Sequence, residues 1–172
     1  MKTNSLAEEY LKQSFIENPS YSFGDWTIMY EHSVKVKDLA LRIAQEIECD
    51  EELLIIESLW HDIGKVYKAD EKILRERHAE LGYQVTKNFL PQLSLPFEKE
   101  ARLISFLKGD LSSIEAQVVK DADIIAFYMD EKLQLAFKTW AEKNNLLNEI
   151  ERKINKLNHL RFNISKQIAP SL

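Results

Sequence analysis

Imidazole and carboxylate groups stand in stretches of this sequence that are otherwise mostly apolar. His61 and Asp62 follow the apolar run 53–60, where an isolated carboxylate would be costly to bury. His32 lies on the apolar face of the helix expected around it, one turn before Val36 and the stripe that continues from it. Asp123 interrupts another mostly apolar segment. Two histidines and two acids are therefore predicted to face the protein interior.

Each of these residues also has a purely structural interpretation. A buried histidine such as His32 is commonly satisfied by hydrogen bonds in a core, and Asp62 could cap a neighbouring helix with His61 as its partner. As a set, however, two imidazoles and two carboxylates suit a divalent cation such as Mn, Fe, Co, Ni, Mg or Zn, with coordination positions left over for water. The residue types thus favour a metal centre that activates water.

Three motifs extend this interpretation. They are EHSVKV around His32, HDIGK at 61–65 and KDAD at 120–123. In order and approximate spacing they resemble the HD-domain superfamily of metal-dependent phosphohydrolases, which is named for its His-Asp doublet. The resemblance covers about residues 30–128, more than half of the chain.

The resemblance implies a role for individual residues. The metal ligands would be His32, His61, Asp62 and Asp123. Asp62 would also orient or deprotonate the attacking water, and Lys65 would contact a substrate phosphate, although an exposed loop lysine is the alternative. Asp121 would be a residue behind the ligands or an acid on the helix surface, with a place among the ligands as the less favoured alternative.

His78 is similar to a further histidine of superfamily members that bind two metals. Those proteins usually supply another histidine on the next helix, but here the matching stretch 106–109 (FLKG) has none. One metal per chain is therefore favoured over two, with His78 a ligand of a second metal or a residue facing the substrate. The same departure disfavours an oxygen-activating di-iron enzyme.

The resemblance implies a hydrolase of phosphate esters, a phosphomonoesterase or a phosphodiesterase. A small phosphorylated substrate, most readily a nucleotide, would be its partner. The alternative is a regulatory module that binds a nucleotide without turning it over. Trp26, Tyr30 and Trp60 are expected to be packing residues, with Trp26 or Tyr21 as candidates to stack on a base.

The elements that must position these residues are helices, because apolar residues recur at spacings of three and four and strict alternation is rare. We expect an all-α, compact bundle of the HD type with about seven to eight helices in a single domain over 1–172, its core at 27–130 and its C-terminal helices, 131–167, packed on that core. The predicted helices are 4–16, 27–48, 51–61, 76–90, 96–107, 113–130 and two within 131–167.

Local residues predict where some helices begin and end. Asp50 is expected to cap the third helix, and Ser112 with Glu115 has the spacing of a capping box. Gly109 should end the fifth helix. An interruption near Asn144 should divide the C-terminal segment. Two further predictions concern single residues. His159 is expected to be a surface or packing residue, and Lys108 and Asp110 either line the pocket or are exposed.

Composition bounds the remaining possibilities. The 172 residues carry 23 Lys and Arg against 28 Asp and Glu, a formal net charge of −5, which disfavours nucleic acid as the partner. A lone Cys49 and the lack of a long apolar run favour the cytoplasm and no membrane association. The basic segment 143–166 is interpreted as a solvated helix face. The oligomeric state stays open, a homo-oligomer included.

Overall fold

The computed structural model describes residues 2–18 and 25–169, and within them it contains helices and no strand. The α-helices are α1 (Lys2–Glu17), α2 (Trp26–Ala44), α3 (Glu51–Trp60), α4 (Glu71–Thr86), α5 (Phe97–Leu107), α6 (Ile114–Tyr128), α7 (Glu131–Lys143), α8 (Leu147–Ile154) and α9 (Asn163–Ile168). Short 3₁₀ helices η2 (Ile63–Val66), η3 (Leu90–Leu93) and η4 (Asn155–His159) lie between them. The predicted all-α fold is confirmed.

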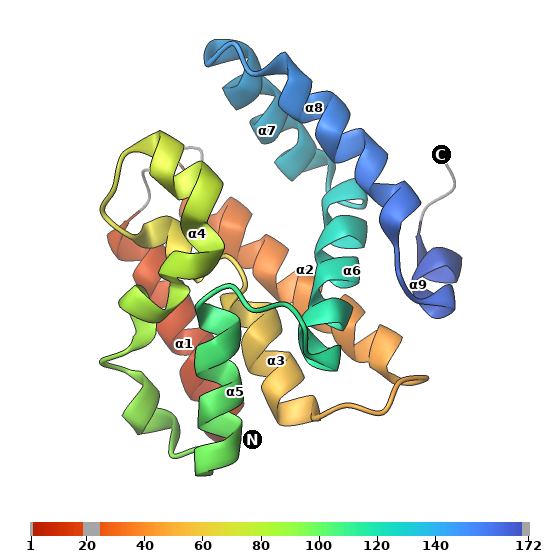
Figure 1. Cartoon of the computed structure of the whole chain (residues 1–172). Coiled ribbons are helices and arrows are strands. Elements are labelled where there is room, and N and C mark those ends of the chain that lie inside the picture. Colours follow the sequence, from red (N-terminus) through yellow and green to blue (C-terminus); the bar gives the residue numbers. More distant parts are fainter. Residues whose placement is uncertain (1, 19–24, 170–172) are drawn as a thin grey trace.

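Helix α3 lies at the centre of the bundle because its side chains are apolar nearly all round. It packs against α1, α2, α5 and α6, and Leu53, Leu54, Ile56 and Leu59 are completely buried. At its end, the indole Nε1 of Trp60 donates to the carbonyl of Ala7 on α1 at 2.9 Å. Figure 1 shows α3 between α1, α2, α5 and α6, so the residues that follow it begin inside the bundle.

Acidic and hydroxyl side chains begin several helices by accepting a backbone N–H bond. Asp25, Asp50, Asp70, Ser113 and Asp130 do so for α2, α3, α4, α6 and α7. The Asp50 cap is confirmed. The prediction of Ser112 was wrong by one residue, because Ser113 accepts from Ala116, and Glu115 is instead bound to Arg102 at 2.5 Å.

Several helix bounds differ from those expected. Helix α2 ends at Ala44 because the next turn is closed by backbone hydrogen bonds between residues three apart, as from Ile47 N to Ala44 O. These replace the bonds between residues four apart that define an α-helix. Helix α4 begins earlier, at the Asp70 cap, and ends at Thr86. Pro91 then lies inside η3. The expected stops near Gly109, which has a φ of 94°, and near Asn144 are both observed.

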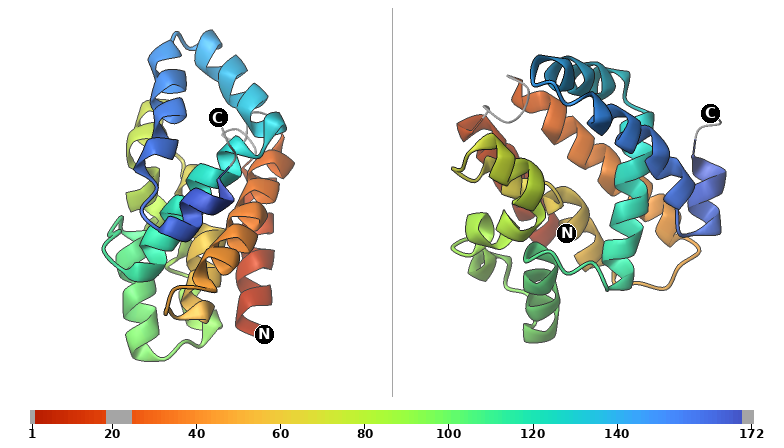
Figure 2. Two further views of the ribbon diagram at one scale, coloured as in Figure 1. Left: turned by 90° about the vertical axis from the view of Figure 1, so that its right-hand side faces the viewer. Right: turned by 45° about the horizontal axis from the view of Figure 1, so that its top comes forward.

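Helices α7 and α8 form a hairpin that packs on α6 and α2 (Figures 1 and 2). The segment after α8 returns along α6 through η4 and α9. Its buried Leu160 joins the apolar core. None of the helices in the described ranges is sufficiently long and apolar to traverse a lipid bilayer.

Candidate metal centre

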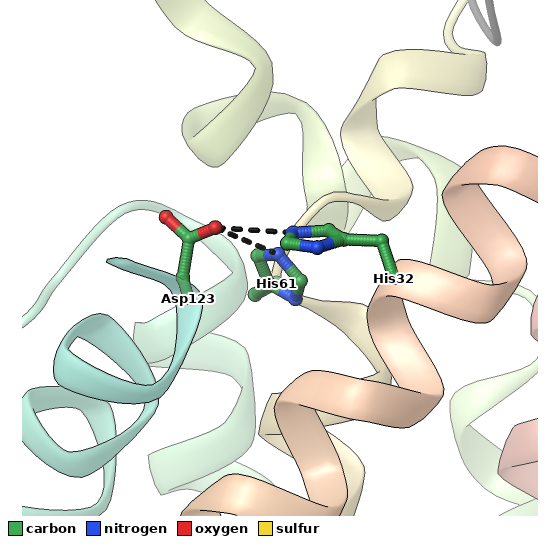
Figure 3. Close-up of side chains that lie close together, drawn as sticks. All are labelled: His32, His61 and Asp123. Carbon is green, nitrogen blue, oxygen red and sulfur yellow. Dashed lines mark hydrogen bonds and ion pairs between the residues drawn. The ribbon is translucent and has the colours of Figure 1, made fainter. Parts of the chain in front are cut away.

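Three elements bring chemistry-bearing side chains to one point. His32 extends from the middle of α2, Asp123 from α6, and His61 from the residue directly after α3 (Figure 3). His32 is on the apolar face of α2, which packs against both α3 and α6. The helical periodicity that buries Val36 and Ala40 thus also directs His32 toward the junction of the three helices.

The distances within this group are short. His32 Nε2 lies 3.1 Å from Asp123 Oδ1, and His61 Nε2 lies 3.8 Å from the same oxygen. One potential ligand atom from each of the three residues lies within 4.8 Å of the others. Ligand atoms at right angles on a metal with bonds of about 2.0–2.2 Å stand about 3 Å apart. The group is therefore close to the size that a metal ion requires.

His61 is oriented by its backbone neighbour. Its Nδ1 lies 2.8 Å from the carbonyl of Ser58, and a carbonyl only accepts, so Nδ1 carries the proton and Nε2 offers a lone pair. Nε2 is buried and has no hydrogen-bond partner among the described residues. A histidine that donates from one nitrogen and directs the other into the site is the usual arrangement of a metal ligand.

Asp62 forms a second, adjoining group with Lys65 and His78. Its side chain is 8 % exposed, and Lys65 on η2 donates a charge-assisted hydrogen bond to Oδ2. His78 Nε2 on α4 lies 3.3 Å from Oδ1, while His78 Nδ1 faces the carbonyl of Leu74 at 3.0 Å. Asp62 Oδ2 is also 3.5 Å from His61 Nε2. The carboxylate therefore lies between the two groups.

Glycine residues allow α4 to approach this group. A Cβ on Gly64 would lie 1.9 Å from the carbonyl oxygen of His78 and 2.9 Å from the backbone nitrogen of Gly82. Real side chains do not tolerate such contacts, so only glycine permits η2 and α4 to touch here. This close packing is what brings His78 to Asp62.

Burial and charge act in opposite directions on these groups. Burial disfavours ionised Asp62 and Asp123, yet Lys65 and His61 hold the pKa of Asp62 well below its usual range, and Lys153 and His32 lower the pKa of Asp123. Burial lowers the pKa of His32 and of His78. The acids are thus ionised and these two imidazoles neutral near pH 7, as metal ligands must be.

The pKa of His61 indicates that the electrostatic potential at the site is negative. Burial alone would lower the pKa of this imidazole, but the charges of Asp62 and Asp123 outweigh burial and raise it. The same two carboxylates would attract a divalent cation placed beside His61 Nε2. Donor types, spacing and the unpaired buried nitrogen all fit an ion such as Mn, Fe, Co, Ni or Zn, which bind mixed nitrogen and oxygen ligands.

Two hollows flank the centre. One, with a volume of about 130 Å³, extends toward the α7–α8 hairpin. It is lined by Met29, His32, Asp62, Lys65, His78, Asp123, Phe127, Leu133, Phe137, Trp140, Glu149, Arg152, Lys153 and Lys156. We call it the hairpin cavity. The other, also about 130 Å³, lies between α4, α5 and α6 and is lined mainly by apolar residues such as Phe106, Leu107 and Val119.

The residues predicted from the sequence are therefore brought together. His32, His61 and Asp123 form one group, and Asp62, Lys65 and His78 adjoin it. The proposed roles of Asp62 as a ligand and Lys65 as a phosphate contact stay predictions.

Other residues considered lie elsewhere. Asp121 is buried, and its carboxylate accepts the backbone N–H groups of Arg161 and Phe162 at 2.9–3.1 Å. It is therefore not an acid on the helix surface. Lys108 is exposed and lies 4.7 Å from the centre of the Tyr83 ring.

Histidine and aromatic residues outside the site follow the packing interpretation. His159 and Asp110 are exposed. The ring of Trp26 lies 6.0 Å from that of Tyr30, and the ammonium of Lys12 is 5.9 Å from the Trp26 ring. Tyr21 lies outside the described residues.

Three residues that line the hairpin cavity were not predicted as site residues from the sequence: Phe137, Trp140 and Lys153. Lys153 had been assigned to a solvated helix face, but it is partly buried and its charge helps to ionise Asp123. The excess of cations over acids between 143 and 166 was a usable signal. It indicated a basic segment without indicating which cation turns inward.

The protein is an all-α bundle in which a His-Asp doublet follows a buried helix. The doublet meets a histidine and an aspartate from two other helices. This combination defines a class of helical domains with a candidate metal centre. Residues 29–128 match the HD domain family. The chain belongs to the HD-domain family, whose members are mostly metal-dependent hydrolases. Comparison with curated proteins and with solved structures yielded no significant match.

Proposed function

We propose that this protein is a metal-dependent hydrolase of phosphate esters, with a nucleotide or a similar small phosphorylated metabolite as substrate. The observation that carries the proposal is the grouping of His32, His61 and Asp123 beside the Asp62–Lys65 pair at the base of a cavity. A purely structural core has no need for buried acids of this kind next to an unpaired imidazole nitrogen.

In the proposed reaction, water loses a proton as its oxygen bonds to phosphorus, the ester P–O bond breaks, and the leaving alkoxide oxygen takes up a proton to become the alcohol. His32, His61 and Asp123, with Asp62, would hold the metal. A bound divalent ion supplies polarisation of a phosphoryl oxygen and a lowered pKa for a coordinated water. Asp62, ionised through Lys65 and His61, would orient the attacking water.

The remaining polar residues would act on the phosphoryl group. Lys65 lies close enough to Asp62 to offset the negative charge that develops on phosphoryl oxygens. His78 is neutral near pH 7 because burial lowers its pKa, so its Nε2 can accept a proton or a second ion. The rings of Phe137 and Trp140 on the cavity wall support a substrate with a planar ring, such as a nucleotide base.

The test is a screen of purified protein loaded in turn with Mn, Fe, Co, Ni, Mg and Zn. Substrates would be mononucleotides, dinucleotides, cyclic nucleotides and dinucleoside polyphosphates. We expect metal-dependent release of phosphate or nucleotide from at least one class, and loss of both metal content and turnover in His61→Ala. His159→Ala, which removes an exposed histidine, is the matched control.

Two outcomes would contradict the proposal. Hydrolysis that persists in metal-free His61→Ala would exclude the metal centre as the catalyst. Tight nucleotide binding without turnover by any metal-loaded form would favour the alternative of a regulatory nucleotide-binding module.

A further inference from the structure

The hairpin cavity is completed by residues that lie outside the segment matched to the HD family. Helices α7 and α8 begin after residue 128 and supply Phe137, Trp140 and Lys153 to its wall. This part of the chain therefore adds chemistry to the centre formed by α2, α3 and α6. The feature with the clearest chemical meaning is the ammonium group of Lys153.

Lys153 is held in place from both sides. Its own backbone carbonyl accepts a hydrogen bond from the Tyr128 hydroxyl at 2.5 Å, which joins the end of α8 to the end of α6. Its ammonium lies 4.6 Å from the centre of the Phe127 ring and 5.8 Å from that of Phe137. Packing therefore fixes the position of the Lys153 ammonium group, which is not free to move as that of a lysine on the surface would be.

The segment after α8 is anchored as well. Asp121 accepts the backbone N–H groups of Arg161 and Phe162, and Leu160 is buried between these contacts and the core. Because Asp121 lies two residues before Asp123 on α6, the same helix that supplies an acid to the metal centre also fixes the chain that follows Lys153. The lysine and the centre are therefore held in one frame.

Lys153 has no carboxylate within ion-pair distance. Among the described residues no Asp or Glu oxygen lies within 4.0 Å of its Nζ, in contrast to Arg152, which binds Glu149 at 2.6 Å. Burial lowers the pKa of Lys153, so keeping its charge inside the cavity opposes folding. A methionine would fill the same space against Phe127 without that cost, so packing alone does not explain the ammonium group.

The charges of the site indicate what the ammonium group is for. Asp62 and Asp123 would offset the two charges of a divalent ion, and Glu149 pairs with Arg152, so Lys65, Lys153 and Lys156 leave a net positive charge on the cavity wall. A phosphate monoester in its dianionic form offsets more of this excess than a diester, which carries a single negative charge. The cationic excess therefore distinguishes two classes of phosphate ester.

We propose that Lys153 binds the phosphoryl group of the substrate in the hairpin cavity, and that this substrate is a dianionic phosphate monoester. This proposal rests on the hydrolase function proposed above. Lys153 donates to a phosphoryl oxygen from α8, while Lys65 approaches the same cavity from η2. The products of hydrolysis are then an alcohol and inorganic phosphate.

The experiment measures binding as well as turnover. Inorganic phosphate and dimethyl phosphate, a singly charged diester, would be titrated calorimetrically into the full chain, both metal-loaded and metal-free. Variants would be Lys153→Met, which keeps the apolar stem, Lys153→Arg, which keeps the charge, and Lys138→Met, which removes an exposed lysine of α7 as the matched control.

We expect wild-type protein to bind inorganic phosphate more tightly than dimethyl phosphate, since a charge-assisted contact is strong. Lys153→Met should weaken phosphate binding by about tenfold or more and raise KM for a monoester, with an unfolding temperature equal to or above that of wild type. Lys153→Arg should retain most of the affinity, and Lys138→Met should not change it. A merely structural lysine would lower the unfolding temperature and leave phosphate affinity unchanged.

Failure of this proposal is distinct from failure of the proposed function. Metal-dependent hydrolysis by wild type, together with unchanged phosphate affinity and KM in Lys153→Met, would overturn the role of Lys153 and leave the hydrolase intact. Phosphate binding that depends on Lys153 without any turnover would support the role of Lys153 and contradict the hydrolase. A wild-type protein that does not bind phosphate would overturn the Lys153 proposal.

Discussion

The carboxylate of Asp62 lies next to residues of both groups of the site. Lys65 binds Oδ2, His78 lies 3.3 Å from Oδ1, and His61 Nε2 is 3.5 Å away. The Asp62 carboxylate stays ionised in spite of burial, because Lys65 and His61 outweigh the loss of hydration. Its oxygens are therefore kept as acceptors, for a metal, for a water or for both.

Replacement of Lys65 tests this arrangement. Lys65→Met removes the charge that most favours ionised Asp62. It also removes the cation that would lie nearest to a phosphoryl group bound beside Asp62. We expect kcat/KM for the hydrolysed ester to fall by about 10²–10³-fold, the usual loss when one preorganised donor is removed. Steady-state kinetics would measure this. Lys68→Met, at an exposed position three residues later, should retain wild-type activity, and equal losses in the two variants would contradict the role of Lys65.

At the scale of elements, η2 and α4 approach each other closely beside the site. Helix α4 delivers His78, and η2 carries Lys65. The two elements meet where Gly64 faces the carbonyl of His78. The geometry of the Asp62 group thus depends on the absence of a side chain at one position.

Gly64→Ala should separate these elements. Its Cβ would lie 1.9 Å from a backbone oxygen that cannot rotate away, so α4 must shift and His78 must leave Asp62. We expect the free energy of unfolding, measured in urea, to fall by at least about 1–3 kcal/mol.

Gly82→Ala provides a graded comparison for that substitution. The new Cβ would meet Leu107 at 3.1–3.2 Å, a contact that a small shift can relieve, so the loss should be smaller. A Gly64→Ala protein as stable as wild type would show that η2 and α4 are not packed as described.

At the scale of the whole molecule, a buried acid in the last turn of α3 couples stability to pH. Glu57 is 1 % exposed, and its Oε2 has no hydrogen-bond partner among the described residues. Burial, and then the charge of Glu115, raise the pKa of Glu57 to about 8. The folded protein therefore binds a proton at Glu57 that the unfolded chain, with an ordinary pKa of 4.5, has released at neutral pH.

The sign of the pH dependence follows from this difference. Between about pH 4.5 and pH 8 the folded state holds more protons at Glu57, so its contribution to stability is complete below pH 4.5 and is lost as pH rises. The loss is at most about 1.4 kcal/mol for each pH unit. Glu57→Gln should match wild type near pH 5 and be more stable near pH 8, as measured by urea unfolding at both values. Glu9→Gln, at an exposed position, should follow wild type, and a pH-independent difference for Glu57→Gln would contradict the prediction.

Much of the fold followed from local sequence. The spacing of apolar residues predicted the helices, and the stops near Gly109 and Asn144 were placed correctly because both depend on residues close in the chain. The cap of α6 was misplaced from Ser113 to Ser112, because Ser112 has Glu115 at the capping-box spacing, whereas in the structure Glu115 is bound to Arg102 and Ser113 forms the cap. The start of α4 was missed because polar residues at 68–72 hid the Asp70 cap.

The sequence by itself determined which residues of α2, α3 and α6 face inward, because helical periodicity and the cost of burying an acid are local properties. His32, His61 and Asp123 meet as a consequence. Only the tertiary structure decided that Lys153 turns into the cavity and that Asp121 holds the backbone at Arg161. Both depend on how the α7–α8 hairpin folds back over α6, and contacts between residues 25 to 40 positions apart leave no periodic pattern in either segment.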